Sequence, residues 1–392
     1  MTDLCERFES DLGSSKTLKN TLESVSSAYG ISTKRLLCSL FQPMRKYFLR
    51  INRLKLSTDE AIEVLKLEGI QARKSGLLDE AIYIEVLPGD PIQPSEKIAV
   101  AEREAAERVM LGADLYLPGL KKLINARKGD EVTVTDENGI PVAKGILLIE
   151  PNEVNRRSRG IAVKVVSSLY KMPKVRELDS YSRGIITDQS YPSMLLIRML
   201  DPPAGKIFVD MTASPGGKIG HLYEITGGKG IYYAFDHTQN KILRLKKELS
   251  RIGASSVIAL KGDSRFISLD HPQIRADITI LDPPCTGLGN RPRLSIQFNE
   301  KDLRNLVSLQ RQLLKEAARI TVPGGLISYS TCTLSYEENE GQVEWALNNL
   351  PLEPVYPNFP FPQSKLTDHP VARFVPGFHD TIGFFAAIFR RK

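Results

Sequence analysis

The sequence predicts an α/β protein whose largest part is a doubly wound domain with a mainly parallel sheet. Two observations carry this prediction. From about Lys171 onward, apolar runs alternate with amphipathic segments, and the runs are nearly continuous, as in strands covered on both faces. The part before Lys171 has shorter strand-like pieces and more Gly and Pro turns. We therefore expect two smaller modules ahead of the doubly wound domain.

Composition narrows the class of protein. The 392-residue chain has 53 Lys and Arg against 46 Asp and Glu, a formal net charge of +7. This excess favours an acidic partner such as nucleic acid, although a solvated basic surface explains it equally well. The four cysteines form no CxxC pair, which favours a reducing compartment and argues against a zinc site and against disulfides. With no signal-peptide core and no apolar run long enough for a bilayer, we expect a cytoplasmic protein.

The first module is expected over residues 1–90. A helical opening leads to a strand at YFLRINRLKL (47–56), a helix at STDEAIEVLKLEGI (57–70) and a second strand at AIYIEVL (81–87). Ser57 and Glu60 have the spacing of a capping box at the start of that helix. Seven basic residues occur between positions 34 and 55 without an acidic one, so this segment either faces phosphates or is a solvated face: Lys34, Arg35, Arg45, Lys46, Arg50, Arg53 and Lys55.

The second module is expected over residues 91–172. We expect a helix at KIAVAEREAAERVM (97–110), followed by four short strands separated by turns such as ENGIP: 113–119, 130–136, 141–150 and 160–166. Strands of this length and spacing predict a small β-barrel. In the loop NRRSRG, Arg156, Arg157 and Arg159 are candidate phosphate contacts.

The third module, residues 173–392, alternates strands and helices, and its start is expected to complete the first module. The strands are expected at KIFVDM (206–211), GIYYAFD (230–236), VIALKGD (257–263), ADITILD (276–282), GGLISYST (324–331) and GFFAAIFRR (383–391). A long helix between the fourth and fifth strands has one apolar stripe, which Gln310 interrupts. This alternation is typical of a doubly wound domain.

Four successive strands of this module end in an acidic residue, namely Asp210, Asp236, Asp263 and Asp282. In such sheets, ligands bind beyond the carboxyl ends of the strands. The loop TASPGGKIG (212–220) has glycines where a helix starts, but it is neither GxGxxG nor a P-loop. An adenosine compound without a triphosphate fits this pattern, and S-adenosylmethionine fits well. Taken alone, the loop is as easily a plain strand–helix turn.

Two cysteines follow neighbouring strands of the predicted sheet. Cys285 follows the fourth strand and Cys332 the fifth, so both thiols are expected over one cleft, either as reactive groups or as small apolar side chains. A methyl donor beside two thiols suggests methylation at carbon 5 of a pyrimidine. A thiolate that adds to carbon 6 makes carbon 5 nucleophilic, Asp282 can bind the cytosine edge, and a base must remove the carbon-5 proton.

At this point the chain resembles a known family. DMTASPGGK, DPPCTGLGNRP and STCTLSYEENE resemble the cofactor loop and the fourth and sixth motifs of the Sun (Fmu-like) RNA cytosine-5 methyltransferases. RINRLK with the capped helix is similar to the RRM-like subdomain of that family, DTIGFFAA to its C-terminal strand, and VMLGADLYLPGL with the following strands to a PUA domain. The PUA insert is typical of the branch with the sixth Sun-domain member and archaeal relatives. That branch methylates cytosine in the tRNA acceptor stem near the 3′ end, at position 72.

The resemblance implies a Rossmann-like methyltransferase fold and a role for each matched residue. It implies that Cys332 is the nucleophile, that Cys285 assists product release, that Asp282 contacts the cytosine and lies near the cofactor, and that Lys218 reaches into the active site. The residues implied to bind S-adenosylmethionine are Thr212, Ala213, Ser214, Pro215, Gly216, Gly217, Lys218, Asp236, Lys241, Asp263 and Asp282. Against the family pattern D-x-C-A-A-P-G-G-K-T, Thr212, Ser214 and Ile219 are departures, which we expect to tune cofactor affinity.

Alternatives remain open. A ribosome-assembly or other RNA-binding factor without catalysis would explain the altered cofactor loop, and an rRNA cytosine-5 methyltransferase would use the same chemistry. A DNA cytosine-5 methyltransferase is disfavoured, because it needs one cysteine and no PUA-like insert. We expect a monomer that acts on tRNA, with no DNA, membrane or metal partner.

Overall fold

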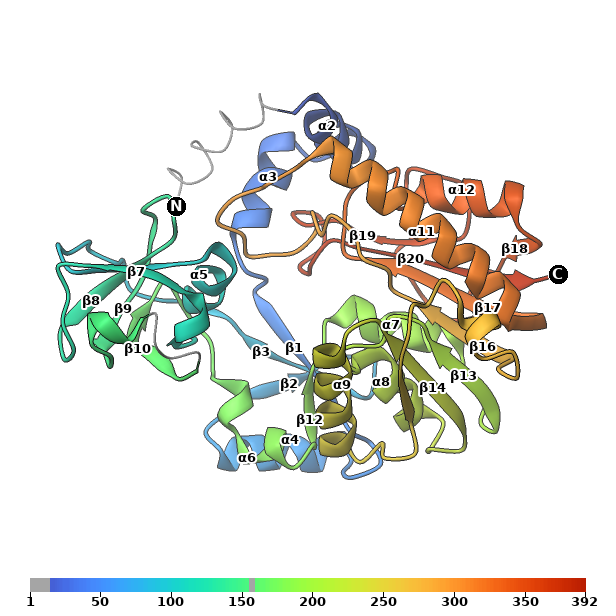
Figure 1. Ribbon diagram of the computed structural model, residues 1–392, viewed down its shortest axis with the longest axis horizontal. Coiled ribbons are helices and arrows are strands. Elements are labelled where there is room, and N and C mark those ends of the chain that lie inside the picture. Colours follow the sequence, from blue (N-terminus) through green and yellow to red (C-terminus); the bar gives the residue numbers. More distant parts are fainter. Residues whose placement is uncertain (1–14, 155–158) are drawn as a thin grey trace.

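The C-terminal part of the protein is an open, twisted sheet. The computed structural model describes residues 15–154 and 159–392 (Figure 1). Five parallel strands lie in the order β15-β14-β13-β16-β17, so the chain changes direction at β13, as predicted for a doubly wound domain. These strands are β13 (Lys206–Asp210), β14 (Gly230–Asp236), β15 (Ile258–Lys261), β16 (Ala276–Leu281) and β17 (Thr321–Thr331).

Three further strands extend this sheet beyond β17. Strand β20 (Phe384–Arg391) pairs antiparallel with β17, and β18 (Leu352–Pro354) and β19 (Ala372–Phe374) both pair antiparallel with β20. The segment at the end of the sequence is therefore an inner strand of the sheet, directly beside the strand that leads to Cys332.

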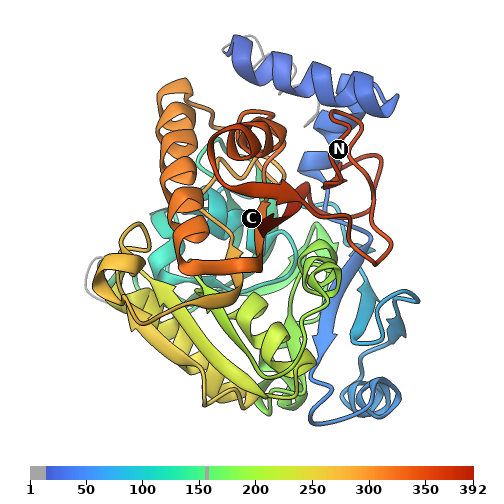
Figure 2. The ribbon, with the colours of Figure 1, turned by 90° about the vertical axis from the view of Figure 1, so that its right-hand side faces the viewer.

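Helices cover both faces of the sheet because its strands are apolar on both sides. Phe208 of β13 belongs to a core with α7 (Tyr191–Leu200), α8 (Gly217–Ile225) and α9 (Gln239–Ile252). Its neighbour Val209 belongs to a core with α11 (Glu300–Ile320) and α12 (Glu340–Asn349). Figure 2 shows α11 and α9 on different sides of the sheet. The short α10 (Ile267–Asp270) lies against α11.

The N-terminal part forms a second, antiparallel sheet in the order β12-β1-β3-β2. Its strands are β1 (Lys46–Ile51), β2 (Ala72–Lys74), β3 (Ala81–Glu85) and β12 (Ile186–Asp188), with α4 (Thr58–Leu67) and α6 (Asp179–Ser182) beside it. The predicted capping box at α4 is confirmed, because Ser57 and Glu60 exchange side-chain-to-backbone bonds. Helices α2 (Lys16–Tyr29) and α3 (Thr33–Phe41) precede this sheet and contact the C-terminal segment, where the rings of Tyr29 and Phe378 are 5.3 Å apart.

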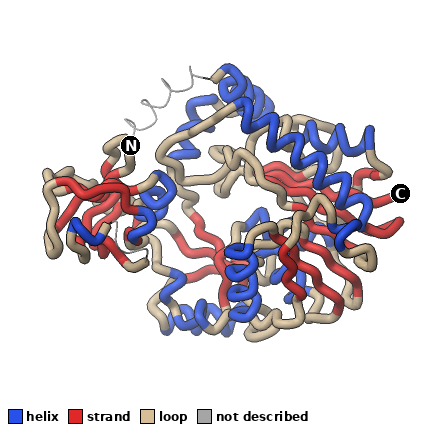
Figure 3. The backbone as a smooth tube through the Cα atoms, viewed as in Figure 1, coloured by secondary structure: helices blue, strands red, loops and turns tan. Residues whose placement is uncertain are grey.

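Between β3 and β12 the chain forms a separate six-stranded barrel-like sheet, seen at the left of Figure 3. Its order is β6-β10-β9-β8-β5-β7. The strands are β5 (Ile98–Ala101), β6 (Leu115–Tyr116), β7 (Leu120–Ile124), β8 (Glu131–Thr135), β9 (Pro141–Leu147) and β10 (Ile161–Ser168), with helix α5 (Arg103–Val109). Two short strands, β4 (Leu87–Pro88) and β11 (Tyr170–Lys171), pair with each other where the chain enters and leaves.

Three expectations are corrected. The helix predicted over 97–110 is wrong in its first part, because Ile98–Ala101 pairs as strand β5 with β7 and β8, and only Arg103–Val109 is helical. Arg50 does not face phosphates, since its side chain is buried against α8. Cys38 is disulfide-bonded, so the expectation that no disulfide forms is wrong at this position.

Two kinds of feature are absent from the described residues. No helix in residues 15–154 and 159–392 is long and apolar enough to cross a membrane. Within the same ranges, no group of three or more His, Cys, Asp or Glu side chains could hold a metal ion.

Candidate active site

The predicted cofactor loop lies between β13 and α8, at the carboxyl edge of the sheet. Hydrogen bonds from its backbone N–H groups fix the course of the loop. Ala213 N donates to Phe235 O at 2.8 Å, and Thr212 N donates to the Asp210 carboxylate at 3.1 Å. Gly216 has φ +117°, and a Cβ there would lie 3.1 Å from Leu245 Cδ1, so a glycine fits this turn best. Helix α8 begins at Gly217, and its free N–H groups favour a negatively charged ligand group.

Asp210 and Asp236 lie beneath this loop. Both side chains are buried, and burial raises the pKa of Asp210 to about 7. The Asp236 carboxylate accepts from Ser214 N at 3.2 Å and contacts Lys241 Nζ at 3.1 Å. Asp236 therefore joins the glycine loop to α9, at the strand end where a carboxylate meets ribose hydroxyls in folds of this kind.

Asp263 lies at the outer side of the same edge. It is half exposed and forms a fork-like pair with Arg265, whose guanidinium keeps the pKa of Asp263 below its usual value. Gly262 N donates to Asp236 O at 3.1 Å, which places the loop after β15 beside the loop after β14. The donors and acceptors of these loops fit a nucleoside with a charged amino-acid tail. Within them, Asp236 and Asp263 would hold the nucleoside and the start of α8 the tail.

Asp282, at the end of β16, lies at the centre of the predicted site. Its carboxylate contacts Lys218 Nζ at 2.5 Å on one oxygen and accepts from Ser330 Oγ at 2.8 Å on the other. Burial disfavours the charge on Lys218, but the carboxylates of Asp282 and Asp210 outweigh it and raise the pKa of Lys218. The Asp282 side chain is thus held from β17 and from α8 together.

Thr212, which departs from the family pattern, forms two hydrogen bonds with the backbone of Asp282. Its hydroxyl donates to Asp282 O at 3.0 Å and accepts from Asp282 N at 3.1 Å. The side chain that replaces the usual cysteine therefore ties the cofactor loop to the loop that holds Asp282.

The two predicted thiols meet. Cys285 Sγ and Cys332 Sγ are 3.5 Å apart, and both residues are partly exposed. The hydrogen bond from Cys285, the charge of Lys218 and a hydrogen bond from Asn290 lower the pKa of Cys332 against the effect of burial and of Asp282. The same contact and burial raise the pKa of Cys285. The pair is thus asymmetric, with Cys332 the more acidic thiol.

Several residues around this centre were not identified from the sequence. Six such residues contact Asp282, a thiol or the loops that hold the thiols: Ser330, Asn290, Thr286, Thr333, Glu338 and Gln310. The only sequence signal was Gln310, a polar residue on the apolar stripe of α11. It is fully buried, and its Nε2 donates to Pro284 O at 2.9 Å.

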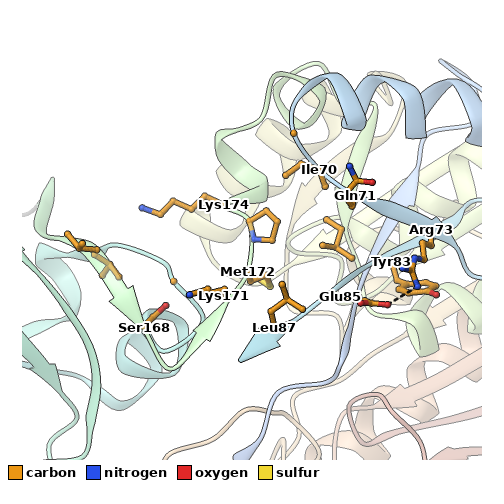
Figure 4. A pocket seen from close by; sticks show the side chains of 16 residues that line it. Ile70, Gln71, Arg73, Tyr83, Glu85, Leu87, Ser168, Lys171, Met172 and Lys174 are labelled. Carbon is orange, nitrogen blue, oxygen red and sulfur yellow. Dashed lines mark hydrogen bonds and ion pairs between the residues drawn. The ribbon is translucent and has the colours of Figure 1, made fainter. Parts of the chain in front are cut away.

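The predicted RNA-binding arginines are only partly within the structure. Arg156 and Arg157 lie outside the described residues, and Arg159 is exposed just before β10. A hollow of about 500 Å³ lies elsewhere, where β2 and β3 meet β10 and residues 171–174 (Figure 4). Its lining includes Arg73, Tyr83, Lys171 and Lys174, and none of the predicted site residues.

Comparisons with known proteins show the family that the chain is similar to. A family model described as 16S rRNA methyltransferase RsmB/F matches residues 197–390, and a PUA domain model matches residues 97–169. The chain is 35% identical over 365 residues to the tRNA (cytosine(72)-C(5))-methyltransferase of Pyrococcus horikoshii, covering 91% of this chain and 92% of that protein. It is 27% identical over 364 residues to human tRNA (cytosine(72)-C(5))-methyltransferase NSUN6, covering 83% and 77%.

A solved structure has the same arrangement. The crystal structure of NSun6 from Pyrococcus horikoshii with SFG matches with a TM-score of 0.85 and 33% identity, covering 96% of this chain and 98% of that chain.

Fold and site together define an RNA cytosine-5 methyltransferase with S-adenosylmethionine as its cofactor. The chain belongs to the RsmB/F methyltransferase family and carries a PUA domain. The resemblance to the Sun family, the enzyme class, the PUA domain and the cofactor are thereby confirmed. That the N-terminal sheet is RRM-like stays a prediction.

Proposed function

We propose that this protein methylates carbon 5 of cytosine 72 in the acceptor stem of tRNA. The observation that carries the chemistry is the pair of thiols 3.5 Å apart beside the Asp282–Lys218 pair. The choice of tRNA is supported by the names of the Pyrococcus and human relatives and by the PUA domain. We expect it to act as a cytoplasmic monomer, without DNA as a substrate.

Cys332 would start the reaction. Its Sγ, as the thiolate, adds to carbon 6, so that a sulfur–carbon bond forms and electron density moves to carbon 5. The Asp282 carboxylate, held by Lys218 and Ser330, accepts from the exocyclic amino group of the cytosine and orients the ring. Bound S-adenosylmethionine supplies the electrophilic methyl carbon.

Cys285 would finish the reaction. The main cause that raises its pKa is the neighbouring Cys332 sulfur, and this sulfur is no longer a free thiolate once it is bonded to carbon 6. Cys285 can then lose its proton to solvent and accept the proton from carbon 5. The carbon 5–carbon 6 double bond re-forms, the sulfur–carbon bond breaks, and Cys332 leaves as a thiolate.

Two cysteine variants test this division of roles. In a reaction with labelled methyl donor and tRNA, Cys332→Ala should give neither label in tRNA nor a covalent protein–RNA adduct. Cys285→Ala should instead trap the adduct, visible as a slowly migrating band under denaturing conditions. If Cys285→Ala gives no such band while the wild type methylates tRNA, the two thiols do not divide the work in this way.

The substrate is tested separately. Bisulfite sequencing of tRNA and rRNA after the reaction should place the new methyl group at position 72 of tRNA. Methylation confined to rRNA would replace tRNA by rRNA as the substrate, as in the family described for residues 197–390. RNA binding without any methylation would favour the non-catalytic alternative.

A further inference from the structure

A buried carboxylate connects the two loops that carry the thiols. Glu338 lies after Cys332 in the loop between β17 and α12, and it is fully buried. Its Oε1 accepts from Thr286 N at 2.9 Å, and its Oε2 accepts from Thr286 Oγ1 at 2.5 Å. Thr286 is the residue directly after Cys285, so the Glu338 side chain reaches from one thiol loop to the other.

A second threonine also links the two thiol loops. Thr333, directly after Cys332, lies with its Oγ1 2.6 Å from Thr286 Oγ1. The two residues that follow the two cysteines are therefore hydrogen-bonded to each other and share one carboxylate. These hydrogen bonds join the residues next to the two cysteines, whose sulfur atoms are 3.5 Å apart.

The remaining contacts of Glu338 come from buried groups. Gln310 Nε2 of α11 donates to Glu338 Oε1 at 3.0 Å and also to Pro284 O at 2.9 Å, just before Cys285. Tyr329 OH donates to Glu338 O at 2.7 Å. Among the described residues, no Lys, Arg or His forms an ion pair with Glu338, although burial is costly for an unpaired charge. Such a group is costly for stability, so stability alone is a poor reason for its presence.

We propose that Glu338 is a positioning residue that holds Cys285 at the distance from Cys332 that the release step requires. This inference rests on the proposed function. It adds that Cys285 depends on Glu338 for its position. The first addition step needs only the Cys332 thiolate and is predicted to survive when Glu338 is changed. The release step needs both sulfur atoms at the correct distance from each other. A displacement of about 1 Å can lower a rate by about 100-fold.

Three variants separate position from charge. Glu338→Gln keeps an oxygen for Thr286 N and Gln310 and an amide that can donate to Thr286 Oγ1, so it should release product within about threefold of the wild type. Glu338→Ala removes every bond of the carboxylate. Thr286→Val removes the two bonds of Thr286 Oγ1 and keeps the one from Thr286 N. Both should slow release by about 10- to 100-fold, with the covalent adduct accumulating. Glu337→Ala, at the exposed neighbouring carboxylate, is the matched control and should behave as the wild type.

The measurements are the fraction of enzyme in the adduct after a fixed time and the dissociation constant for S-adenosylmethionine. Support consists of adduct accumulation with a cofactor affinity within about twofold of the wild type. If Glu338→Ala does not fold, Thr286→Val decides. The inference is overturned if the folded variants release product normally, or if cofactor binding and adduct formation fall together.

The proposed function is tested in the same experiment. If wild-type protein makes no methylated tRNA and Cys285→Ala traps nothing, the function fails whatever Glu338 does. If Cys285→Ala traps the adduct while Thr286→Val and Glu338→Ala release product normally, the function stands and only the positioning role fails.

Discussion

Lys218 is a cation whose charge acts on the Cys332 thiol. Its ammonium group lowers the pKa of Cys332, while Asp282 raises it. Lys218→Met removes a charge that lowers the pKa of Cys332 and keeps the Asp282 charge that raises it, so the pKa of Cys332 should rise. Because the thiolate is the reactive form, the acidic limb of kcat/KM against pH should move to higher pH.

The matched control for this prediction is Lys241→Met. Lys241 pairs with Asp236 on the cofactor side, so its loss should raise the KM for S-adenosylmethionine and leave the acidic limb in place. An unchanged limb in Lys218→Met would mean that the cation does not act on the nucleophile.

Single residues also show where sequence analysis stops. Asp282, Cys285 and Cys332 were selected because they follow strands that a doubly wound sheet brings together. Glu338 was not, because SYEENE contains three glutamates that look alike in sequence. In the structure Glu337 is exposed, Glu338 joins the thiol loops, and Glu340 pairs with the buried Arg373. Only tertiary contacts distinguish them.

At the scale of elements, one ion pair joins the N-terminal sheet to α8, the helix that follows the cofactor loop. Arg50 of β1 pairs with Glu224 of α8 at 2.8 Å, both side chains being almost completely buried, and it donates to Gly217 O at 2.8 Å. Arg50→Met leaves a buried carboxylate unpaired and should lower the free energy of unfolding by about 3–5 kcal/mol, measured by urea denaturation.

The exposed pair of Arg73 and Glu85, 2.9 Å apart, provides the comparison. Arg73→Met should cost less than about 1 kcal/mol, since exposed pairs contribute little. Equal costs for the two variants would contradict a special role of the buried pair. The double variant Arg50→Met with Glu224→Gln should recover part of the loss, because no buried charge then lacks a partner.

Elements were predicted best where their pattern is long and worst where it is short. The strands of the catalytic sheet and the amphipathic α9 and α11 follow from periodicity. The four residues Ile98–Ala101 are apolar and precede a helix, so nothing local separates them from its first turn. Their pairing with β7 and β8 is a long-range contact that the sequence does not reveal.

At the scale of the whole molecule, the net charge of +7 suggests that phosphate contacts supply much of the RNA affinity. Replacing Arg156, Arg157 and Arg159 together by Ala should weaken tRNA binding. It should also reduce the slope of log affinity against log salt by about 1 for each phosphate that the variant no longer binds. The triple change of Arg244, Lys246 and Lys247 on α9 removes the same charge from another part of the surface. If both triple variants behave alike, the loop before β10 has no special contact with tRNA.

The relation between the modules was only partly expected from the sequence. Strand β12 returns to the N-terminal sheet only after the barrel has been completed. Glu107 of α5 accepts from Leu294 N at 3.0 Å, so a barrel helix directly contacts the segment that follows Cys285. The start of the third module was expected to complete the first one, whereas the contact of Glu107 with Leu294 has no local signal, because it joins residues far apart in the chain.

The inner position of β20 has a consequence for how the enzyme is made. Both cysteines leave the ribosome well before residues 384–391, yet the strand that leads to Cys332 has β20 as its neighbour. A nascent chain that already carries both thiols therefore still lacks one side of the sheet that aligns them. A message cut short within its codons for β20 would yield a protein with every reactive group, but with β17 paired to β16 alone.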